Sequence, residues 1–283
     1  MGRDIVLTGV PRGGTTLACR LLGTCPGAVS LFEPIEVMRL PADNPPAAVS
    51  EVEAFFRSAR ASLLATGRAP SKQRSGHVPD NPFGARGSDG RRELLAEPGW
   101  IRVDAPPPGF ALIVKHNAAF TALLRWLQAR FEAFAIVRNP AAVLASWHSV
   151  ELPVAQGRVP AGEHFDPLLR ARLEREPDCL RRQLIVLDWF FSAFSRHLDP
   201  SHVIRYEDVV ATRGAALVDR TGLVPGALPA LDNRNANPLY AHSQGRLAEA
   251  LDALAASQGA WQAWYPREAV ETACDRLREA RPR

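Results

Sequence analysis

Short runs of apolar and β-branched residues recur along the chain, and turns rich in glycine, proline or polar residues follow them. The first run, Asp4 to Thr8, is too short for a typical helix and has no polar side, which is typical of a buried parallel strand. Further strands are predicted at 28–32, 111–115, 134–137 and 202–206. The pattern therefore predicts a sheet made of buried strands.

Helical spacing of apolar residues occurs between these runs. Leu17, Leu21 and Leu22 share one side of a predicted helix from Thr15 to Gly23, and the final glycine suits a helix end. Further helices are predicted at 47–66, at 120–131, after Pro140, and at 180–198, 245–257 and 266–280. Because strands alternate with helices, the expected fold is a three-layer α/β/α domain with a mainly parallel central sheet. Ligands of such sheets bind beyond the carboxyl ends of the strands.

Two long segments lack this regular pattern. Residues 67–109 are rich in glycine, proline, serine, arginine and aspartate, and they include the run Pro106 to Pro108, which sustains neither a helix nor a central strand. Residues 152–176 are charged and are predicted to be irregular. We expect a single domain over residues 1–283 in which both segments are excursions that form the walls of an acceptor site, since loops carry specificity on α/β scaffolds.

Composition and charge narrow the function. The net charge of +4 comes mainly from arginine; it suits an anionic ligand and predicts no nucleic-acid binding. No apolar stretch approaches the roughly 20 residues of a membrane span, and no secretion signal precedes the first strand, so we expect a cytoplasmic protein. The four cysteines have no zinc spacing, and no ligand cluster predicts a metal.

The turn from Gly9 to Thr16 joins the first predicted strand to the first helix, where backbone amides and the helix dipole hold anions. Its spacing resembles that of the nucleotide-binding P-loop, but Thr15 stands where that motif has lysine. Arg12 is the one cation of the turn, which disfavours phosphoryl transfer from ATP and magnesium. A glycine-rich turn without a ligand is the alternative interpretation.

The stretch Pro11-Arg-Gly-Gly-Thr-Thr-Leu17 resembles the 5′-phosphosulfate loop of sulfotransferases that use 3′-phosphoadenosine 5′-phosphosulfate (PAPS), with a glycine in place of the usual serine. The resemblance implies the P-loop NTPase-like sulfotransferase fold. It also implies that this loop binds the 5′-phosphosulfate through Arg12, Gly13, Gly14, Thr15 and Thr16.

A second stretch, residues 134–147, resembles the 3′-phosphate motif of the same family, with Asn139 in place of the common aspartate. An arginine at a predicted strand end is followed eight residues later by a serine on a predicted helix. The resemblance implies that Arg138 binds the 3′-phosphate through charge-assisted hydrogen bonds and that Ser146 reaches the same group. Taken singly, each has an ordinary structural interpretation, an ion pair for Arg138 and a helix position for Ser146.

Two candidates compete for the catalytic base. Glu33 lies in a Phe-Glu-Pro element after the second predicted strand, and the resemblance to carbohydrate sulfotransferases implies that it accepts the proton of the acceptor hydroxyl. His116 resembles, with a one-residue deletion, the histidine base of the cytosolic members. Lys115 is expected to donate to the bridging oxygen or to the sulfuryl group, and Arg12 and the loop amides are expected to stabilise the departing oxygen together with it. We rank Glu33 ahead of His116. An ion pair or cap for Glu33 and a structural hydrogen bond for His116 are the alternatives.

Three later segments also resemble the family. Residues 203–208 match a segment that we interpret as architectural, and residues 257–261 match a C-terminal region weakly, so Trp261 is also a candidate core residue. Residues 235–246 are expected to contribute to the 3′-phosphate pocket.

The resemblance implies transfer of a sulfuryl group from PAPS to a hydroxyl of a small molecule such as a carbohydrate, a lipid or a secondary metabolite. It releases 3′-phosphoadenosine 5′-phosphate (PAP) and needs no metal. Two rivals stay open: a P-loop kinase or phosphotransferase that uses ATP, and a non-catalytic nucleotide- or glycan-binding protein of the same fold.

Overall fold

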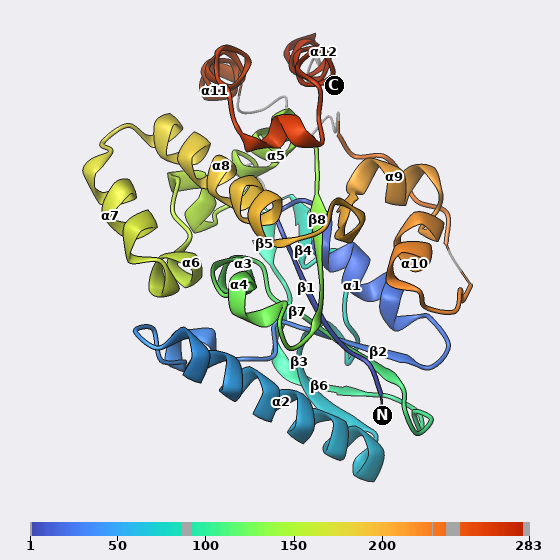
Figure 1. Ribbon diagram of the computed structural model, residues 1–283. Coiled ribbons are helices and arrows are strands. Elements are labelled where there is room, and N and C mark those ends of the chain that lie inside the picture. Colours follow the sequence, from blue (N-terminus) through green and yellow to red (C-terminus); the bar gives the residue numbers. More distant parts are fainter. Residues whose placement is uncertain (1, 87–91, 228, 236–243, 280–283) are drawn as a thin grey trace.

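A computed structural model describes residues 2–86, 92–227, 229–235 and 244–279 (Figure 1). At its centre is a five-stranded sheet in the order β2-β7-β1-β8-β9. All neighbouring strands pair in parallel. The strands are β1 (Asp4–Gly9), β2 (Ala28–Phe32), β7 (Ala111–Lys115), β8 (Glu132–Val137) and β9 (Val203–Arg205).

The strands are the apolar runs of the sequence, and they are buried because helices cover both faces of the sheet. Every residue of β2 and β7 is buried. In β1, Ile5 pairs with Ile113 on one side and with Glu132 on the other. Since β1 is the middle strand, the turn that follows it opens at the centre of the carboxyl edge.

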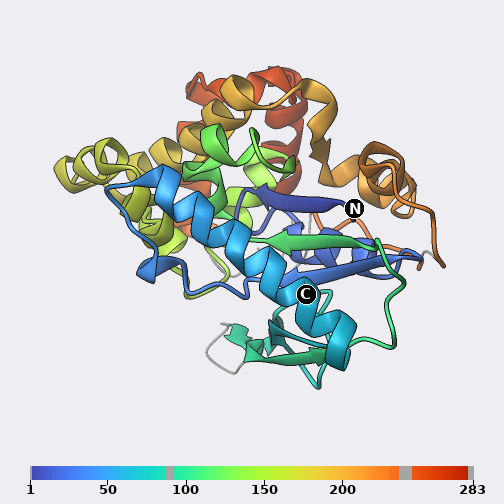
Figure 2. The same ribbon diagram turned by 60° about the horizontal axis from the view of Figure 1, so that its bottom comes forward.

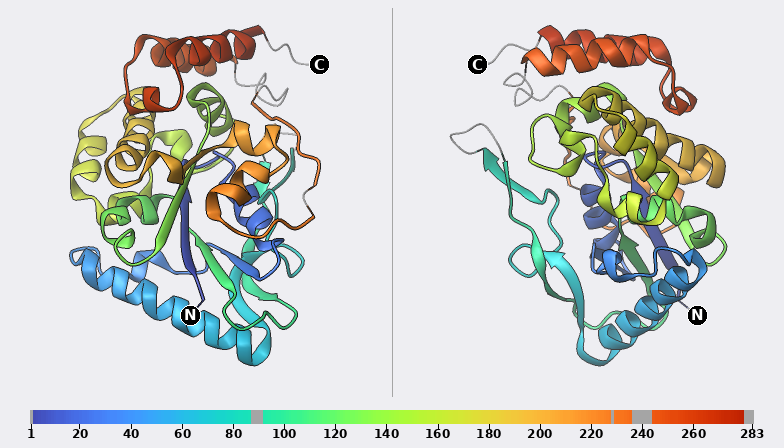
Figure 3. Two further views of the ribbon diagram at one scale, coloured as in Figure 1. Left: turned by 45° about the vertical axis from the view of Figure 1, so that its right-hand side comes forward. Right: turned by 90° about the vertical axis from the view of Figure 1, so that its left-hand side faces the viewer.

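The helices form the two outer layers. One face of the sheet carries α1 (Thr15–Gly23), α9 (Tyr206–Ala211) and α10 (Ala215–Thr221), and the other carries α3 (Ala118–Ala122), α4 (Leu124–Leu127) and α8 (Cys179–His197) (Figures 1 and 3). The long helix α2 (Pro45–Thr66) contacts β7 and α4. The expected three-layer α/β/α class is confirmed.

The last helices lie beyond the carboxyl edge of the sheet. There α11 (Gln244–Ala256) and α12 (Arg267–Glu279) pack on each other and on α5 (Pro140–Trp147), the helix that follows β8 (Figure 1). The helices α8, α11 and α12 begin and end within one residue of the predicted bounds, and α5 is the helix predicted after Pro140. The predicted helix 120–131 is instead the pair α3 and α4, and the strand predicted to reach Tyr206 ends at Arg205. No helix within the described ranges is long and apolar enough to cross a bilayer.

The expectation that 67–109 is irregular was wrong. The segment holds two antiparallel ribbons, β3 (Arg68–Gln73) with β6 (Glu97–Arg102) and β4 (Phe83–Arg86) with β5 (Arg92–Leu94). Pro70 and Pro98 are tolerated because each strand of a two-stranded ribbon has an unpaired edge, where a missing N–H costs no ladder bond. The ribbons stand beside the sheet without joining it (Figure 2).

The expectation that 152–176 is irregular was also wrong. It contains a 3-10 turn (Pro153–Gln156) and two helices, α6 (Pro160–Phe165) and α7 (Pro167–Arg175). Each of the three prolines stands at the start of its element, where its missing N–H would be unpaired in any case. Asp166 caps α7 by accepting from the Leu169 amide. These prolines therefore mark where the elements begin.

Candidate functional site

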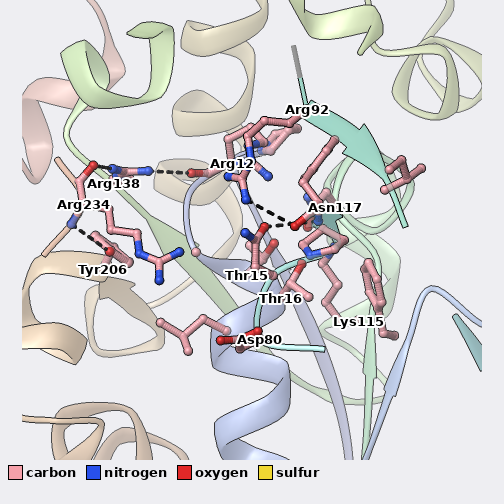
Figure 4. Close-up of a pocket in the computed structure, with 18 of the residues that line it drawn as sticks. Arg12, Thr15, Thr16, Asp80, Arg92, Lys115, Asn117, Arg138, Tyr206 and Arg234 are labelled. Atoms are coloured by element: carbon pink, nitrogen blue, oxygen red, sulfur yellow. Dashed lines mark hydrogen bonds between the residues drawn. The ribbon is translucent and has the colours of Figure 1, made fainter. Parts of the chain in front are cut away.

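A pocket of about 310 Å³ opens at the carboxyl edge of the sheet, and the segments that follow all five strands line it (Figure 4). Such an edge is where open α/β sheets bind ligands. From these segments come Glu33 after β2, Lys115 and Asn117 at the end of β7, Arg12, Gly14, Thr15 and Thr16 after β1, Arg138 after β8 and Tyr206 after β9. The β3 to β5 segment and the chain at 230–234 supply the remaining walls, together with Ser149 and Leu152.

The turn after β1 has the shape of an anion-binding loop. Gly14 has a φ of 90° and caps α1, which begins at Thr15, and Gly14, Thr15 and Thr16 all line the pocket. A Cβ on Gly14 would lie 2.5 Å from the ring of Tyr206, and one on Gly13 would lie 2.7 Å from the Val10 carbonyl oxygen. In this loop conformation, a side chain at position 13 would collide with the Val10 carbonyl oxygen, which favours glycine there.

Arg12 joins the two motifs of the sequence. Its Nε donates to Ser146 Oγ at 3.1 Å, and its carbonyl oxygen accepts from a terminal nitrogen of Arg138 at 3.1 Å. The indole of Trp147 donates to the Pro11 carbonyl at 2.8 Å, which ties α5 to the loop. Two stretches separated by more than a hundred residues are thus one continuous wall.

Arg138 is 5% exposed and is held in a defined orientation. Its Nε donates to Asn235 Oδ1 at 2.7 Å, a terminal nitrogen donates to the Arg234 carbonyl, and its guanidinium lies over the Tyr206 ring at 4.7 Å. Arg12 and Arg138 line the same pocket (Figure 4). Two guanidinium groups at one pocket suit a ligand with two separated anionic groups.

Glu33 is held between two ammonium groups. Lys115 Nζ donates to Oε1 and Lys72 Nζ donates to Oε2, both at 2.7 Å. Although burial opposes a charged carboxylate, the ammonium groups of Lys115 and Lys72 hold the pKa of Glu33 well below its ordinary value. The backbone of Glu33 has a φ of 45°, an unfavourable conformation for a non-glycine residue that is typical of functional sites.

His116 lies behind the pocket wall. Its Nε2 accepts from the Ile35 amide at 3.2 Å, and its ring packs on Phe120. Burial lowers the pKa of His116 to about 3, so the ring is neutral at pH 7. His116 therefore makes the structural hydrogen bond that was the alternative to a role as base. Its Nε2, the nitrogen that would accept a proton, already accepts from the Ile35 amide.

Asn117 occupies the position in the wall that was expected for His116. It lines the pocket next to Lys115, and its Oδ1 is buried with no hydrogen-bond partner among the described residues. A buried acceptor atom at a pocket wall is a contact point for a ligand donor such as a hydroxyl.

The segment interpreted as architectural connects the site to the C-terminal part of the chain. Glu207 accepts from the Asn139 amide, from Asn235 Nδ2 and from the Tyr265 hydroxyl at 3.0, 2.7 and 2.7 Å. Asn235, in turn, orients Arg138. Trp261 is buried and belongs to the core. Of the predicted range 235–246, residues 236–243 lie outside the described residues.

The structure brings most of the predicted residues together. Arg12, Gly14, Thr15, Thr16, Glu33, Lys115 and Arg138 line the pocket. The other three predicted residues, Gly13, His116 and Ser146, are described and lie behind this lining.

Sequence reasoning missed Lys72, Asn117 and Tyr206 as wall residues. The sequence could have pointed to Lys72, because lysine is rare in this chain: of 34 lysines and arginines, only Lys72 and Lys115 are lysines. Across the ranges that the structure covers, no group of three His, Cys, Asp or Glu side chains is placed to hold a metal.

The sequence matches no protein family profile and no curated protein. Among solved structures, the chain is similar to the sulfotransferase domain from the curacin biosynthetic pathway, with a TM-score of 0.42 and 14% sequence identity. The similarity covers 99% of this chain and 91% of that domain. The function proposed below rests on the pocket residues and their motifs.

Proposed function

We propose that the protein is a sulfotransferase that moves a sulfuryl group from PAPS to a hydroxyl of a small acceptor and releases PAP. The observation that carries the proposal is that Arg12 and Arg138 line one pocket. They come from the two stretches whose sequences resemble the 5′-phosphosulfate and 3′-phosphate motifs.

The charge of the pocket lining supports this donor. Arg138 would hold the 3′-phosphate, and Arg12 with the amides at the start of α1 would hold the 5′-phosphosulfate. A volume of about 310 Å³ lies at the lower end of the range for ligand pockets. The donor supplies an activated sulfur whose bridging oxygen leaves with PAP.

The residues near Glu33 suit the transfer step. Glu33 would accept the proton of the acceptor hydroxyl, and Lys115 would stabilise the negative charge on the bridging oxygen as it departs. The buried Oδ1 of Asn117 would accept a hydrogen bond from the acceptor and orient it. His116 would support this arrangement from behind, through its contact with the Ile35 amide.

The residues of the turn between β1 and α1 favour PAPS over ATP as the donor. Thr15 stands where a nucleoside triphosphate site has the lysine that neutralises the β- and γ-phosphates. A sulfuryl group carries less negative charge than a phosphoryl group, so Arg12 and backbone amides are a sufficient counterpart.

Calorimetry with PAP and with ATP tests the proposal. We expect micromolar PAP binding without magnesium and weaker ATP binding with it. Arg138→Ala should abolish PAP binding, because it removes a guanidinium that makes charge-assisted contacts; a hundredfold or greater loss corresponds to about 3 kcal/mol. Arg130→Ala removes an arginine that is paired with Glu53 on the surface and is the matched control.

Equal PAP affinity in Arg138→Ala and in the wild-type protein would refute the assignment of Arg138. Sulfuryl transfer from PAPS to a panel of sugars, lipids and other alcohols then separates an enzyme from a non-catalytic binder. Binding of PAP without transfer to any acceptor favours the binder.

A further inference from the structure

Both lysines of this arginine-rich chain contact the same carboxylate. The sequence has 34 lysines and arginines, and all but Lys72 and Lys115 are arginines. Each lysine donates to a different oxygen of Glu33 at 2.7 Å. An ammonium is a compact charge that rotates freely between acceptors, whereas a guanidinium holds one planar arrangement. Lysine at these two positions therefore suits a site where the partner changes.

Lys72 is positioned at the site by a buried hydrogen bond between the β3–β6 ribbon and the end of β2. The preceding residue, Ser71, is buried, and its Oγ accepts from the Phe32 amide at 2.9 Å, which fixes β3 against the end of β2. The ammonium of Lys72 lies 6.0 Å from the Phe32 ring centre, and that of Lys115 lies 4.6 Å from it. The β3–β6 ribbon, which is not part of the central sheet, thus places a second cation at the end of β2.

The two lysines differ in freedom. The side chain of Lys115 is 2% exposed, whereas that of Lys72 is 32% exposed and lines the pocket. Lys72 is therefore the cation that has room to change partners when a ligand enters.

The charge around Glu33 favours such a change. Among the residues that the structure describes, the titratable groups that face it are Lys72 on β3, Lys115 and His116 at the end of β7, and Cys19 on α1. His116 is neutral, and burial raises the pKa of Cys19 to about 12, so two cations face one anion. A carboxylate between two ammonium groups is a weak base, and a second anion in the pocket would balance the extra cation.

We propose that Lys72 is a further residue of the transfer site: it holds Glu33 before the donor binds and contacts the sulfuryl oxygens during transfer. The proposal rests on the proposed function and deepens it. When Lys72 turns to the sulfuryl group, Glu33 loses one ion pair and becomes a stronger base at the moment the acceptor hydroxyl needs one.

The step is balanced without another reactant. The acceptor oxygen forms a bond to sulfur, the bond from sulfur to the bridging oxygen breaks, and its electron pair leaves on PAP. The hydroxyl proton passes to Glu33. Lys72 keeps its three protons and acts only through its charge and hydrogen bonds.

Lys72→Met, Lys72→Arg and the control Arg68→Met test this inference. Arg68 is an exposed cation on the same strand and has no contact with Glu33 among the described interactions. We expect Lys72→Met to lower kcat about 100-fold, the cost of removing one preorganised donor, and to leave PAP affinity unchanged, because PAP has no sulfuryl group. Lys72→Arg should recover part of kcat, and Arg68→Met should behave like the wild-type protein.

The pH profile supplies a second readout. Because kcat/KM reports the free enzyme, loss of the Lys72 charge should raise the pKa of Glu33 and move the acid side of the profile to higher pH. A purely structural role for Lys72 would lower the melting temperature or PAP affinity and leave this side of the profile in place.

A wild-type kcat and an unshifted profile in Lys72→Met would overturn the inference, as would equal losses in Lys72→Met and Arg68→Met. Absence of transfer by the wild-type protein would instead count against the proposed function. The Lys72 contact is then tested without activity, by carbon-13 NMR titration of the Glu33 carboxyl, and an unchanged Glu33 pKa in Lys72→Met would overturn it.

Discussion

Glu33 and His116 follow neighbouring strands, and the same buried environment acts on them in opposite ways. Two ammonium groups outweigh the burial of Glu33 and hold it charged, whereas burial of His116 holds it neutral. The nitrogen of His116 that faces Ile35 is occupied, and the Glu33 carboxylate lines the pocket. At the residue scale, this difference favours Glu33 as the base.

Glu33→Gln should keep PAP binding and lose sulfuryl transfer by about 10²- to 10⁴-fold, because the amide preserves the shape of the side chain but accepts no proton. Steady-state rates and PAP calorimetry measure both quantities. Glu36→Gln is the control, since Glu36 is an exposed neighbour paired with Arg39. Transfer at the wild-type rate in Glu33→Gln would move the base role to another residue.

At the scale of elements, the short turn between β1 and α1 forms the part of the pocket that the proposed function assigns to the 5′-phosphosulfate. Gly14 must leave its backbone at a φ of 90° and must leave space for the Tyr206 ring, which arrives from the start of α9. The motif indicated the glycine, but the reason for it comes from a helix almost two hundred residues later.

Gly14→Ala should lower the free energy of unfolding by about 1–3 kcal/mol and weaken PAP binding, because the new Cβ would lie 2.5 Å from Tyr206 in a backbone region unfavourable for alanine. Gly109→Ala separates the two causes. Gly109 has a φ of 80°, and its Cβ would meet no atom within 4 Å, so it carries the backbone cost alone. Urea unfolding and calorimetry measure the pair; identical losses of PAP affinity would show that the Tyr206 contact is irrelevant.

The two segments 67–109 and 152–176 show how composition misleads at this scale. Proline interrupts a central strand, but it is tolerated in two-stranded ribbons and favoured at the first position of a helix. Pro70 and Pro98 lie in a two-stranded ribbon, and Pro160 and Pro167 lie at the first position of a helix. The glycine- and proline-rich composition of 67–109 and the charge of 152–176 carry no information about these positions, so both segments were predicted to be irregular where ribbons and helices form.

At the scale of the whole molecule, a buried neutral histidine links stability to pH. The pKa of His116 falls from 6.5 to about 3 on folding. Between these values the unfolded chain binds a proton that the folded chain excludes, so the free energy of unfolding decreases as the pH falls from about 7 toward 4. Glu33 also lowers the free energy of unfolding as the pH falls, but at lower pH. Below about pH 4.5 the unfolded carboxyl binds a proton while the folded carboxylate stays charged, so the stabilisation that its lowered pKa provides is progressively lost.

His116→Gln should reduce this acid sensitivity, because glutamine keeps an acceptor oxygen for the Ile35 amide and does not titrate. We expect a smaller fall in melting temperature between about pH 8 and 5 than in the wild-type protein, equivalent to a change on the order of 1–3 kcal/mol. His77→Gln, at an exposed histidine, is the control. The same fall in His116→Gln and in the wild-type protein would contradict this link.

The sequence by itself determined the central strands, most of the helices and the α/β class, and it singled out the two stretches around Arg12 and Arg138, which line the pocket. These features are local: apolar runs, helical spacing and glycine at a strand-to-helix turn act within a few residues of each other. Because parallel strands end at a common edge, local information was also enough to expect Glu33 and Lys115 near the loop.

Only the tertiary structure decided that Lys72 joins Lys115 on Glu33, that Asn117 rather than His116 faces the pocket, and that Tyr206 closes over Gly14. Each of these contacts joins residues whose separation along the chain gives no periodic signal. Their positions depend on how the ribbon, the strand ends and the outer helices pack, and packing selects contacts by shape and buried charge.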